Sequence, residues 1–239
     1  MSPFKCLFVI SVLVCTVVTA RRTIRSTNHY CLPLSQYQNP PNGINQCGRK
    51  ECPRYTELNG HVKDLTNVTV RRVEAGVYAT RTSTKCNLTD ALIDSYLPLH
   101  YYFYGQEVRM NRTIPIMLFT TKMPAEHRCD YTHQLQFYLP LVNHTNYPDP
   151  TEESRVQVTA KQEECFVVYH WIGKITTQAT YNNYFNLKTN LTDSDSFNLA
   201  YNENKFAHAR YDPSCRPGAR HEIWIPLDSC PSAESSSSD

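Results

Sequence analysis

An N-terminal leader and the cysteines that follow it most constrain what this chain can fold into. Lys5 stands before an apolar run over residues 6–18, and the small residues Val18-Thr19-Ala20 close the pattern that a signal peptidase recognises. The apolar run is shorter than the roughly 20 residues that a membrane-spanning helix needs. We therefore expect residues 1–20 to be a signal peptide and the mature protein to be secreted and extracellular.

Secretion places the cysteines in an oxidising environment. Two of the ten cysteines lie in the leader, so the mature chain keeps eight. An even number predicts four disulfides, with about 105 possible pairings. Each bridge contributes ~2–4 kcal/mol, mainly by restricting the unfolded chain. One candidate bridge, Cys215 to Cys230, would hold the last predicted strand. The eight cysteines are Cys31, Cys47, Cys52, Cys86, Cys129, Cys165, Cys215 and Cys230.

Five N-glycosylation sequons mark segments that should lie on the surface. Each has the acceptor pattern Asn-X-Thr with no proline in the middle. Glycans at all five would shield much of the middle of the chain, so a protein-binding face should lie in the longest acceptor-free stretches, residues 26–66 and 193–230. The acceptors are Asn67, Asn87, Asn111, Asn143 and Asn190.

Length and charge indicate a single secreted domain. Removing residues 1–20 from 239 leaves 219, enough for one domain with its own core. The formal net charge of +2 favours neither nucleic acid nor an acidic membrane as a partner. We expect a disulfide-tied N-terminal arm over residues 21–60, a β-rich domain over residues 61–230 and a disordered Ser-rich tail over residues 231–239.

Hydrophobic alternation with a period of two predicts most of the secondary structure. It occurs over residues 97–104, 135–141 and 223–227, as half-buried strands require. The more continuously apolar residues 114–121 and 165–175 suit central strands, and residues 69–84 suit one or two more. One short helix fits residues 91–96, ending before Pro98. We predict an all-β fold, an antiparallel sandwich or barrel of about seven to eight strands, with no internal repeat.

No motif with a catalytic or metal-binding mechanism stands out. His127, Cys129 and His133 lie close in sequence and have metal-binding side chains, but in a secreted chain Cys129 belongs more often to a disulfide. His170 is a weak candidate base. A Gly-x-Ser-x-Gly elbow, a phosphate loop and metalloprotease spacing are all missing. The chain also has only seven glycines, against about seventeen at average usage. We expect no enzyme, no metal and no cofactor.

Tyrosine content suggests binding instead. The chain has sixteen tyrosines, a residue enriched in protein interfaces although also common in strands. If residues 97–104 form a strand, His100, Tyr102 and Tyr104 point away from the core side that holds Leu97 and Leu99. These three side chains are the candidate binding face.

The cysteine-bridged, sequon-rich, glycine-poor layout from Cys31 to Cys230 resembles the salivary immunosuppressant glycoproteins of ticks. That resemblance implies a host-directed binder that suppresses T-cell or cytokine responses by burying an aromatic patch against a host extracellular protein: a cytokine, a receptor or a cell-surface ligand. Secreted decoys of large DNA viruses share the same composition.

Tick salivary lipocalins are the second resemblance. The segments 164–168 and 221–225 are similar to the late cysteine strand and the acidic-apolar-Trp strand of that family. The N-terminal tryptophan of lipocalins is missing, and the spacing of Cys215 and Cys230 differs from theirs. This resemblance implies a carrier that sequesters a small host mediator, an amine or a lipid. The two alternatives differ in whether the strands close around a cavity.

Overall fold

The structure, a computed structural model, describes residues 50–58, 61–105, 110–111, 113–173, 176–212 and 218–232. The chain divides into two units, Met1–Tyr30 and Cys31–Asp239, and the described residues all belong to the second unit. The predicted signal peptide, most of the predicted arm, residues 233–239 of the tail, and Cys31, Cys47 and Cys215 lie outside the described residues. Those predictions stay predictions.

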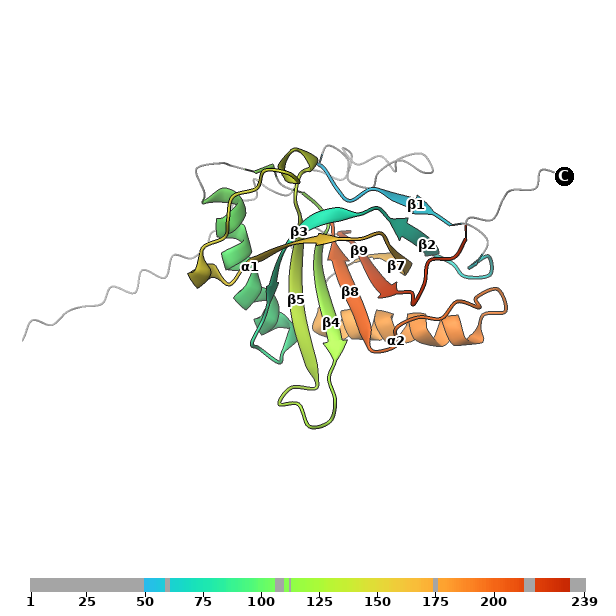
Figure 1. Ribbon diagram of the computed structural model, residues 1–239. Helices are drawn as coiled ribbons and strands as arrows, with labels where there is room; N and C mark the ends of the chain where they lie inside the picture. The colour runs from blue at the N-terminus through green and yellow to red at the C-terminus, as the bar shows by residue number, and fades with distance from the viewer. Residues whose placement is uncertain are drawn as a thin grey trace, which may run out of the picture. The chain divides into compact units, whose positions relative to one another are not determined.

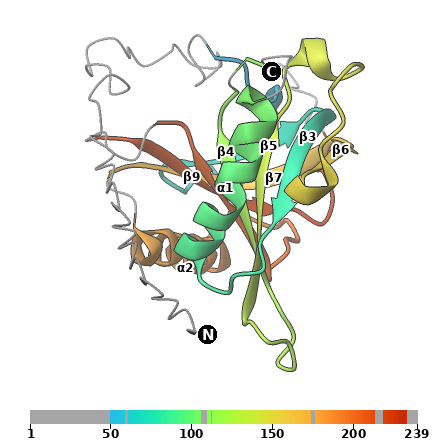
Figure 2. The same cartoon turned by 90° about the vertical axis from the view of Figure 1, so that its left-hand side faces the viewer.

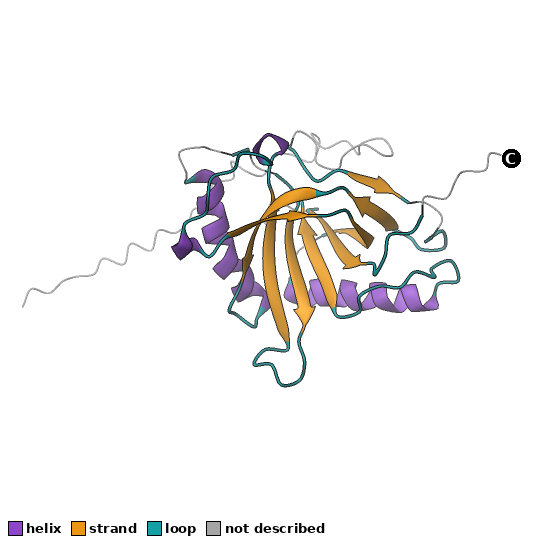
Figure 3. Ribbon diagram, in the orientation of Figure 1, coloured by secondary structure: helices purple, strands orange, loops and turns teal. Residues whose placement is uncertain are grey.

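The described strands form one curled antiparallel sheet (Figure 1, Figure 3). It has nine strands in the order β1-β2-β7-β9-β8-β4-β5-β3-β6, which confirms the all-β antiparallel class with more strands than predicted. The ends of this order are the edge strands β1 and β6, so the sheet is a half-barrel and does not close. The strands are β1 Tyr55–Glu57, β2 Val68–Val73, β3 Gly76–Thr82, β4 Ile116–Lys122, β5 Tyr131–Tyr138, β6 Gln157–Lys161, β7 Glu164–Ile172, β8 Lys205–Arg210 and β9 Arg220–Pro226.

Two helices of 17 residues each, α1 Leu88–Tyr104 and α2 Thr177–Asp193, cover one face of the sheet. In Figure 2, α1 lies in front of β4 and β5. We call this side the helix-covered face and the opposite, concave side the inner face. Side chains alternate between the two faces along each strand, because successive residues of a strand point to opposite sides. Two short 3-10 helices, η3 Leu141–Asn143 and η4 Glu152–Ser154, lie between β5 and β6.

The element order contains a duplication that the sequence does not show. The first repeat is β2-β3-α1-β4-β5 and the second is β6-β7-α2-β8-β9. The strand order from β2 to β6 is symmetric: replacing each strand by its counterpart in the other repeat gives the same order read backwards. Strands β4 and β8 are counterparts and pair with each other at the centre. The repeats share helix length and topology but no visible sequence motif. The repeat is therefore present in the structure although none is found in the sequence.

Residues 97–104 form the second half of α1, so the predicted strand there is wrong. The side chain of Asn87 caps the helix by accepting hydrogen bonds from the amides of Thr89 and Asp90. Leu99 and Phe103 are four residues apart, so they share a side in a helix as well as in a strand, which is why the alternation misled. Pro98 lies inside the helix and costs one backbone hydrogen bond without ending it.

The predicted face of His100, Tyr102 and Tyr104 is consequently not formed. Tyr102 is 2% exposed and its hydroxyl donates a hydrogen bond to the carbonyl oxygen of Pro148, 2.7 Å away. The rings of His100 and Tyr104 lie 4.7 Å apart, one helical turn from each other, and both are partly exposed. These two side chains share a side of α1 that Tyr102 does not.

The second helix, α2, was not predicted at all. Its buried residues recur at helical spacing, but only three of them, Tyr184, Leu187 and Leu191, are apolar. The hydroxyl of Thr176 caps α2 by accepting a hydrogen bond from the amide of Ala179 at 3.0 Å. The Asn- and Thr-rich remainder of the helix faces solvent, so the sequence carries a weak apolar pattern.

Two disulfides join described cysteines. Cys86 pairs with Cys129 and Cys165 pairs with Cys230, with Cα atoms 5.2 and 5.1 Å apart. The second bridge shows that the candidate pairing of Cys230 with Cys215 is wrong. Cys52 is also disulfide-bonded, to a cysteine outside the described residues. The segment that follows it, β1, pairs with β2 and so belongs to the sheet and not to a separate arm.

Among the sequon residues, Asn143 differs from the others. It is 8% exposed. The other four acceptors, whose glycosylation stays a prediction, are exposed: Asn67, Asn87, Asn111 and Asn190. Neither described helix is long and apolar enough to cross a membrane. The described residues contain no group of three or more His, Cys, Asp or Glu that could hold a metal ion.

Candidate functional site

A pocket of about 230 Å³ lies between the first turns of α1 and α2, above the central strands β4 and β8. We call it the seam pocket, because it lies where the two structural repeats meet. Its position follows from the topology, since β4 and β8 are the paired central strands and each is preceded in its repeat by one of the two helices. The pocket is lined by Leu88, Thr89, Leu92, Ile116, Leu118, Leu135, Thr176, Thr177, Thr180, His208 and Arg210.

The two repeats contribute different chemistry to the seam pocket. All but one of the first repeat's lining residues are apolar, and they come from α1, β4 and β5. The described residues of the second repeat contribute no apolar side chain to the lining. Its lining residues are threonines from the start of α2 and the side chains of His208 and Arg210 on β8. The pocket therefore has an apolar wall facing a polar, cationic wall, the arrangement that suits a ligand with an apolar body and a polar end.

The first turns of the two helices touch at the pocket. The hydroxyl oxygens of Thr89 and Thr177 lie 2.9 Å apart, a hydrogen bond in which either group can donate. Within α2, the hydroxyl of Thr180 donates to the carbonyl oxygen of Thr176 at 3.1 Å. Both helix N-termini carry partial positive charge, although their caps already satisfy some of the free amides. This end of the pocket is therefore mildly electropositive.

Arg210 brings a full positive charge to the same place. Within the described residues its side chain has no ion pair and no side-chain hydrogen bond, and its Nε atom is buried without a partner. Burial lowers the pKa of Arg210, and the nearby phenol of Tyr96 opposes this effect. A guanidinium nevertheless stays protonated in a protein. The pocket thus contains a cation whose anion is missing from the described part of the chain.

His208 also lines the pocket, two residues before Arg210 on β8, and does not add a second charge. It is 1% exposed, its ring stacks on Trp171 with centroids 5.5 Å apart, and its Nε2 lies 3.3 Å from Nδ1 of His221. Burial lowers the pKa of His208 well below its usual value, and the charges of His221 and Arg210 lower it further. We therefore treat His208 as a neutral, polar part of the wall.

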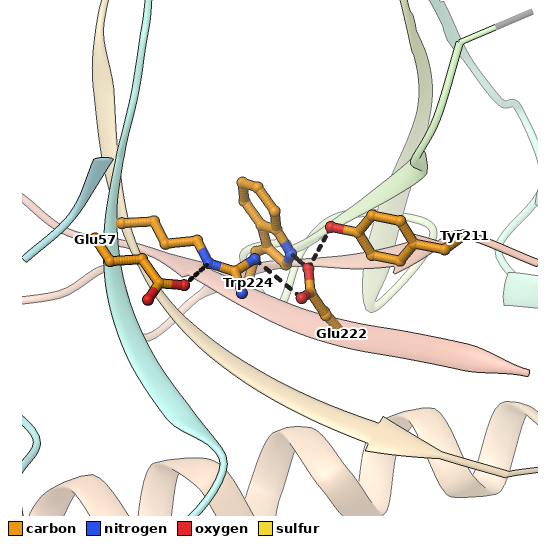
Figure 4. A network of polar contacts seen from close by, with 5 residues as sticks. Glu57, Tyr211, Glu222 and Trp224 are labelled. Atoms are coloured by element: carbon orange, nitrogen blue, oxygen red, sulfur yellow. Dashed lines mark hydrogen bonds and ion pairs between the residues drawn. The ribbon is translucent and has the colours of Figure 1, made fainter. Parts of the chain in front are cut away.

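The inner face holds the opposite arrangement, a buried charge with all its partners (Figure 4). One carboxylate oxygen of Glu222 accepts a hydrogen bond from Nη1 of Arg71 at 2.9 Å. The other accepts from the hydroxyl of Tyr211 at 2.6 Å and from the indole Nε1 of Trp224 at 2.7 Å. The ring of Tyr55 stacks 4.5 Å from the guanidinium. Burial alone would lower the pKa of Arg71, but Glu222 and the two tyrosines outweigh it and raise that pKa.

Among the described residues, the hollow found beside this network is small. The hollow bounded by Met117, Phe119, Phe166 and Trp224 has a volume of about 10 Å³, close to the size of one water molecule. The lipocalin resemblance implied a ligand cavity inside the curve of the sheet; among the described residues, side chains leave only this small hollow beside the network. Within the described residues the larger hollows lie elsewhere.

A second hollow, of about 400 Å³, lies at the end of α1 and is more open. It is bounded by Pro98, Tyr101, Tyr102 and Gly105 on one side and by residues 151, 153 and 154 on the other. Among its described lining residues, the one charged side chain is that of Glu153, so this hollow has a carboxylate where the seam pocket has a guanidinium.

The structure places the residues singled out from the sequence in different surroundings. Cys129 is in a disulfide, and His133 is buried, with hydrogen bonds to Thr120 and to the carbonyl oxygen of Cys86. His208 and Arg210 were not predicted from the sequence. The signal for them is that large side chains alternate with alanines over residues 206–210.

The curled antiparallel sheet and its two covering helices make the described part of the chain a half-barrel. The sequence pattern of the SOUL heme-binding protein family matches residues 50–226, and the chain belongs to that family. It is not identified with the salivary immunosuppressant family that it resembles; of that prediction, the β-rich class is what holds. No curated protein matches the chain.

Several solved structures share parts of the fold. The C-terminal domain of EcmrR matches with a TM-score of 0.48 and 9% identity over 68% of this chain and 98% of its own. A hydrolase encoded by lin2189 from Listeria innocua matches with a TM-score of 0.40 and 13% identity over 67% and 91%. SAV2435, solved bound to tetraphenylphosphonium, matches with a TM-score of 0.40 and 9% identity over 69% and 95%. We base no conclusion on these distant likenesses.

Proposed function

We propose that this protein is a secreted carrier that holds a small apolar ligand in the seam pocket and does not catalyse a reaction. The observation that carries the proposal is the pocket itself, with its apolar wall from the first repeat and its polar wall from the second. Membership of a family named for binding a small molecule supports it. The leader and the five sequons support secretion.

The name of the family suggests heme as the ligand, but the described residues fit heme poorly at this pocket. Ligand pockets usually measure about 300–1,000 Å³, whereas the seam pocket measures about 230 Å³. The imidazole that lines it, His208, turns its Nε2 toward His221 and not toward an open position for iron. Only Arg210 suits one part of heme, a propionate. We therefore propose a smaller ligand and derive no step that involves iron.

In a host, such a carrier would act by sequestering a small mediator and so dampen a response. This version of the immunosuppressive prediction needs no protein interface. The competing version, in which the protein captures a cytokine or receptor, is supported by the tyrosine content and the sequons, but the aromatic face proposed for it is not formed, since Tyr102 is buried. We therefore place the carrier first and the host-protein binder second.

The test is binding of simple ligands to the purified glycosylated protein, measured by native mass spectrometry and calorimetry. The panel is octanoic acid, octanol, octylamine and hemin. In the variant Leu92→Trp, a larger side chain on the pocket wall fills the seam. The matched control is Leu97→Trp, the same change on the same helix at a side chain that is 52% exposed and does not line the pocket.

We expect a member of the panel to bind wild type and Leu97→Trp, and to lose at least tenfold in affinity in Leu92→Trp. Equal melting temperatures of the two variants would exclude misfolding as the cause. Equal binding by both variants would mean that the ligand lies elsewhere, and no binding by wild type would overturn the carrier proposal. Capture of a host protein instead would favour the second candidate function.

A further inference from the structure

We infer that the seam pocket takes an apolar ligand with a single carboxylate, and that Arg210 is the partner of that carboxylate. The inference rests on the proposed carrier function and specifies its ligand. The charge at the pocket gives the first reason. Among the described residues, Arg210 is the only permanently charged side chain that lines it, and no acidic side chain of that part of the chain does. An amine would meet an uncompensated cation, and a neutral apolar ligand would leave that cation unpaired.

Comparison with the other described arginines gives the second reason. The arginines that are buried or half-buried nearly all meet a carboxylate, as the cost of burying an unpaired charge requires. Arg71 meets Glu57 and Glu222. The same holds for three further pairs: Arg72 with Glu163, Arg81 with Asp94 and Arg220 with Asp212. Within the described residues, Arg210 is the half-buried arginine without such a partner.

The chemistry of the missing partner follows from the guanidinium. A guanidinium presents parallel N–H donors that match the two oxygens of a carboxylate, and such charge-assisted pairs are stronger than neutral hydrogen bonds. The touching first turns of α1 and α2, at Thr89 and Thr177, add partial positive charge at the same end of the pocket. Because His208 remains neutral there, one carboxylate balances the charge and a second would not.

The apolar wall, opposite Arg210, determines the chemistry of the remainder of the ligand. The side chains of Leu88, Leu92, Ile116, Leu118 and Leu135 offer only apolar surface, so the remainder of the ligand should be a hydrocarbon chain or small ring. A dianionic or strongly polar ligand would leave its second polar group against leucine. A fatty acid and an aromatic monocarboxylic acid share the required chemistry.

The experiment compares octanoic acid with octanol and octylamine, which differ only at the polar end. We expect wild type to prefer the acid over the alcohol by roughly 10-fold to 100-fold, the range of a charge-assisted hydrogen bond, and to bind the amine most weakly. In Arg210→Gln the preference for the acid over the alcohol should fall to about twofold. Arg210→Lys should keep part of the preference, because it keeps the charge.

The control is Arg54→Gln, which removes an exposed arginine away from the pocket and should leave the preference as in wild type. Equal binding of acid and alcohol by wild type would overturn this inference and leave the carrier proposal standing. An undiminished preference in Arg210→Gln would also overturn it. If none of the three ligands binds, this inference fails, and if hemin does not bind either, the carrier proposal fails with it. Where wild type does prefer octanoic acid, the same comparison of benzoic acid with benzyl alcohol distinguishes a ligand with a ring from a ligand with a chain.

Discussion

The two faces of the sheet hold buried charges in opposite states. On the inner face, Glu222 and Arg71 satisfy each other, with Tyr211 and Trp224 completing the network. On the helix-covered face, Arg210 lies half-buried without an ion pair in the described residues. The strands that carry these groups are neighbours, because β9 pairs with β8. The difference therefore does not come from distance, but from the face to which each side chain points.

This comparison separates a structural charge from a charge with a function. A buried ion pair between Arg71 and Glu222 ties together strands that are far apart in sequence, since the two residues are separated by 151 positions. A half-buried cation with no partner lowers stability and gives nothing to the fold in return. Its presence beside a pocket is explained if a ligand supplies the partner. The following predictions test this distinction in order of expected effect.

The largest effect is expected from Glu222→Gln. The substitution keeps the shape of the side chain but leaves the guanidinium of Arg71 buried without a carboxylate that contacts it closely, and breaking a buried pair in this way costs about 3–5 kcal/mol. Urea unfolding followed by tryptophan fluorescence measures the change. Glu203→Gln is the matched control, because it breaks a more exposed pair with Lys188 and should cost less than about 1 kcal/mol. Equal losses in the two variants would remove the basis for calling the inner network structural.

Loss of the Cys165–Cys230 bridge is expected to come next. Cys165 lies in the core under α2, and the bridge spans 65 positions and holds the segment after β9. Replacing both cysteines by serine should cost about 2–4 kcal/mol, mainly by freeing the unfolded chain. Unfolding in urea with and without reductant checks this, since reductant should affect the double variant less than wild type. A double variant as stable as wild type would show that non-covalent packing is sufficient to hold the end of the sheet.

The sequence predicted the strands better than the helices, for physical reasons. Part of β5 alternates between apolar and polar residues, and β4 and β7 have long apolar stretches, so burial on one or both faces was evident. The second half of helix α1 was taken for a strand, because apolar residues that recur at every second position also include residues four apart, which share a side of a helix.

The seam pocket was out of reach of the sequence. The alternation over residues 206–210 places Phe206, His208 and Arg210 on one face of a strand, and that much could have been predicted. Which face the helices cover depends on the pairing of β8 with β4, about ninety positions earlier. Whether a carboxylate contacts Arg210 depends on the positions of all its neighbours in the folded protein. Contacts of this range are set by the assembled sheet and not by local pattern.

The two faces should also differ in their response to acid. Burial lowers the pKa of His133, His208 and His221, and all three lie on the helix-covered face or beside it. These imidazoles are neutral in the folded protein, whereas in the unfolded chain they bind protons below their usual pKa of about 6.5. Their contribution to stability is therefore complete above about pH 6.5 and is lost as the pH falls below it, at up to roughly 1.4 kcal/mol per pH unit for each histidine.

Urea unfolding at several pH values measures this slope. We expect little change between pH 7 and 8, a steady loss below pH 6.5, and a shallower loss in His208→Gln, whatever that substitution does to stability at neutral pH. The same slope in His208→Gln and wild type would show that His208 takes up its proton in the folded state.

The smallest effect, and the one that bears most on the seam pocket, is expected from Arg210→Met. Methionine has a similar reach and no charge, so the substitution removes a half-buried cation that lacks an ion pair in the described residues. Stability in the absence of ligand should stay the same or rise by less than about 1 kcal/mol. Arg71→Met, the same change on the inner face, should cost about 3–5 kcal/mol because it leaves the carboxylate of Glu222 unpaired. Thermal and urea unfolding of the two variants side by side decide the matter. A loss in Arg210→Met as large as that in Arg71→Met would mean that Arg210 also serves the fold, and the reason for assigning its charge to a ligand would disappear.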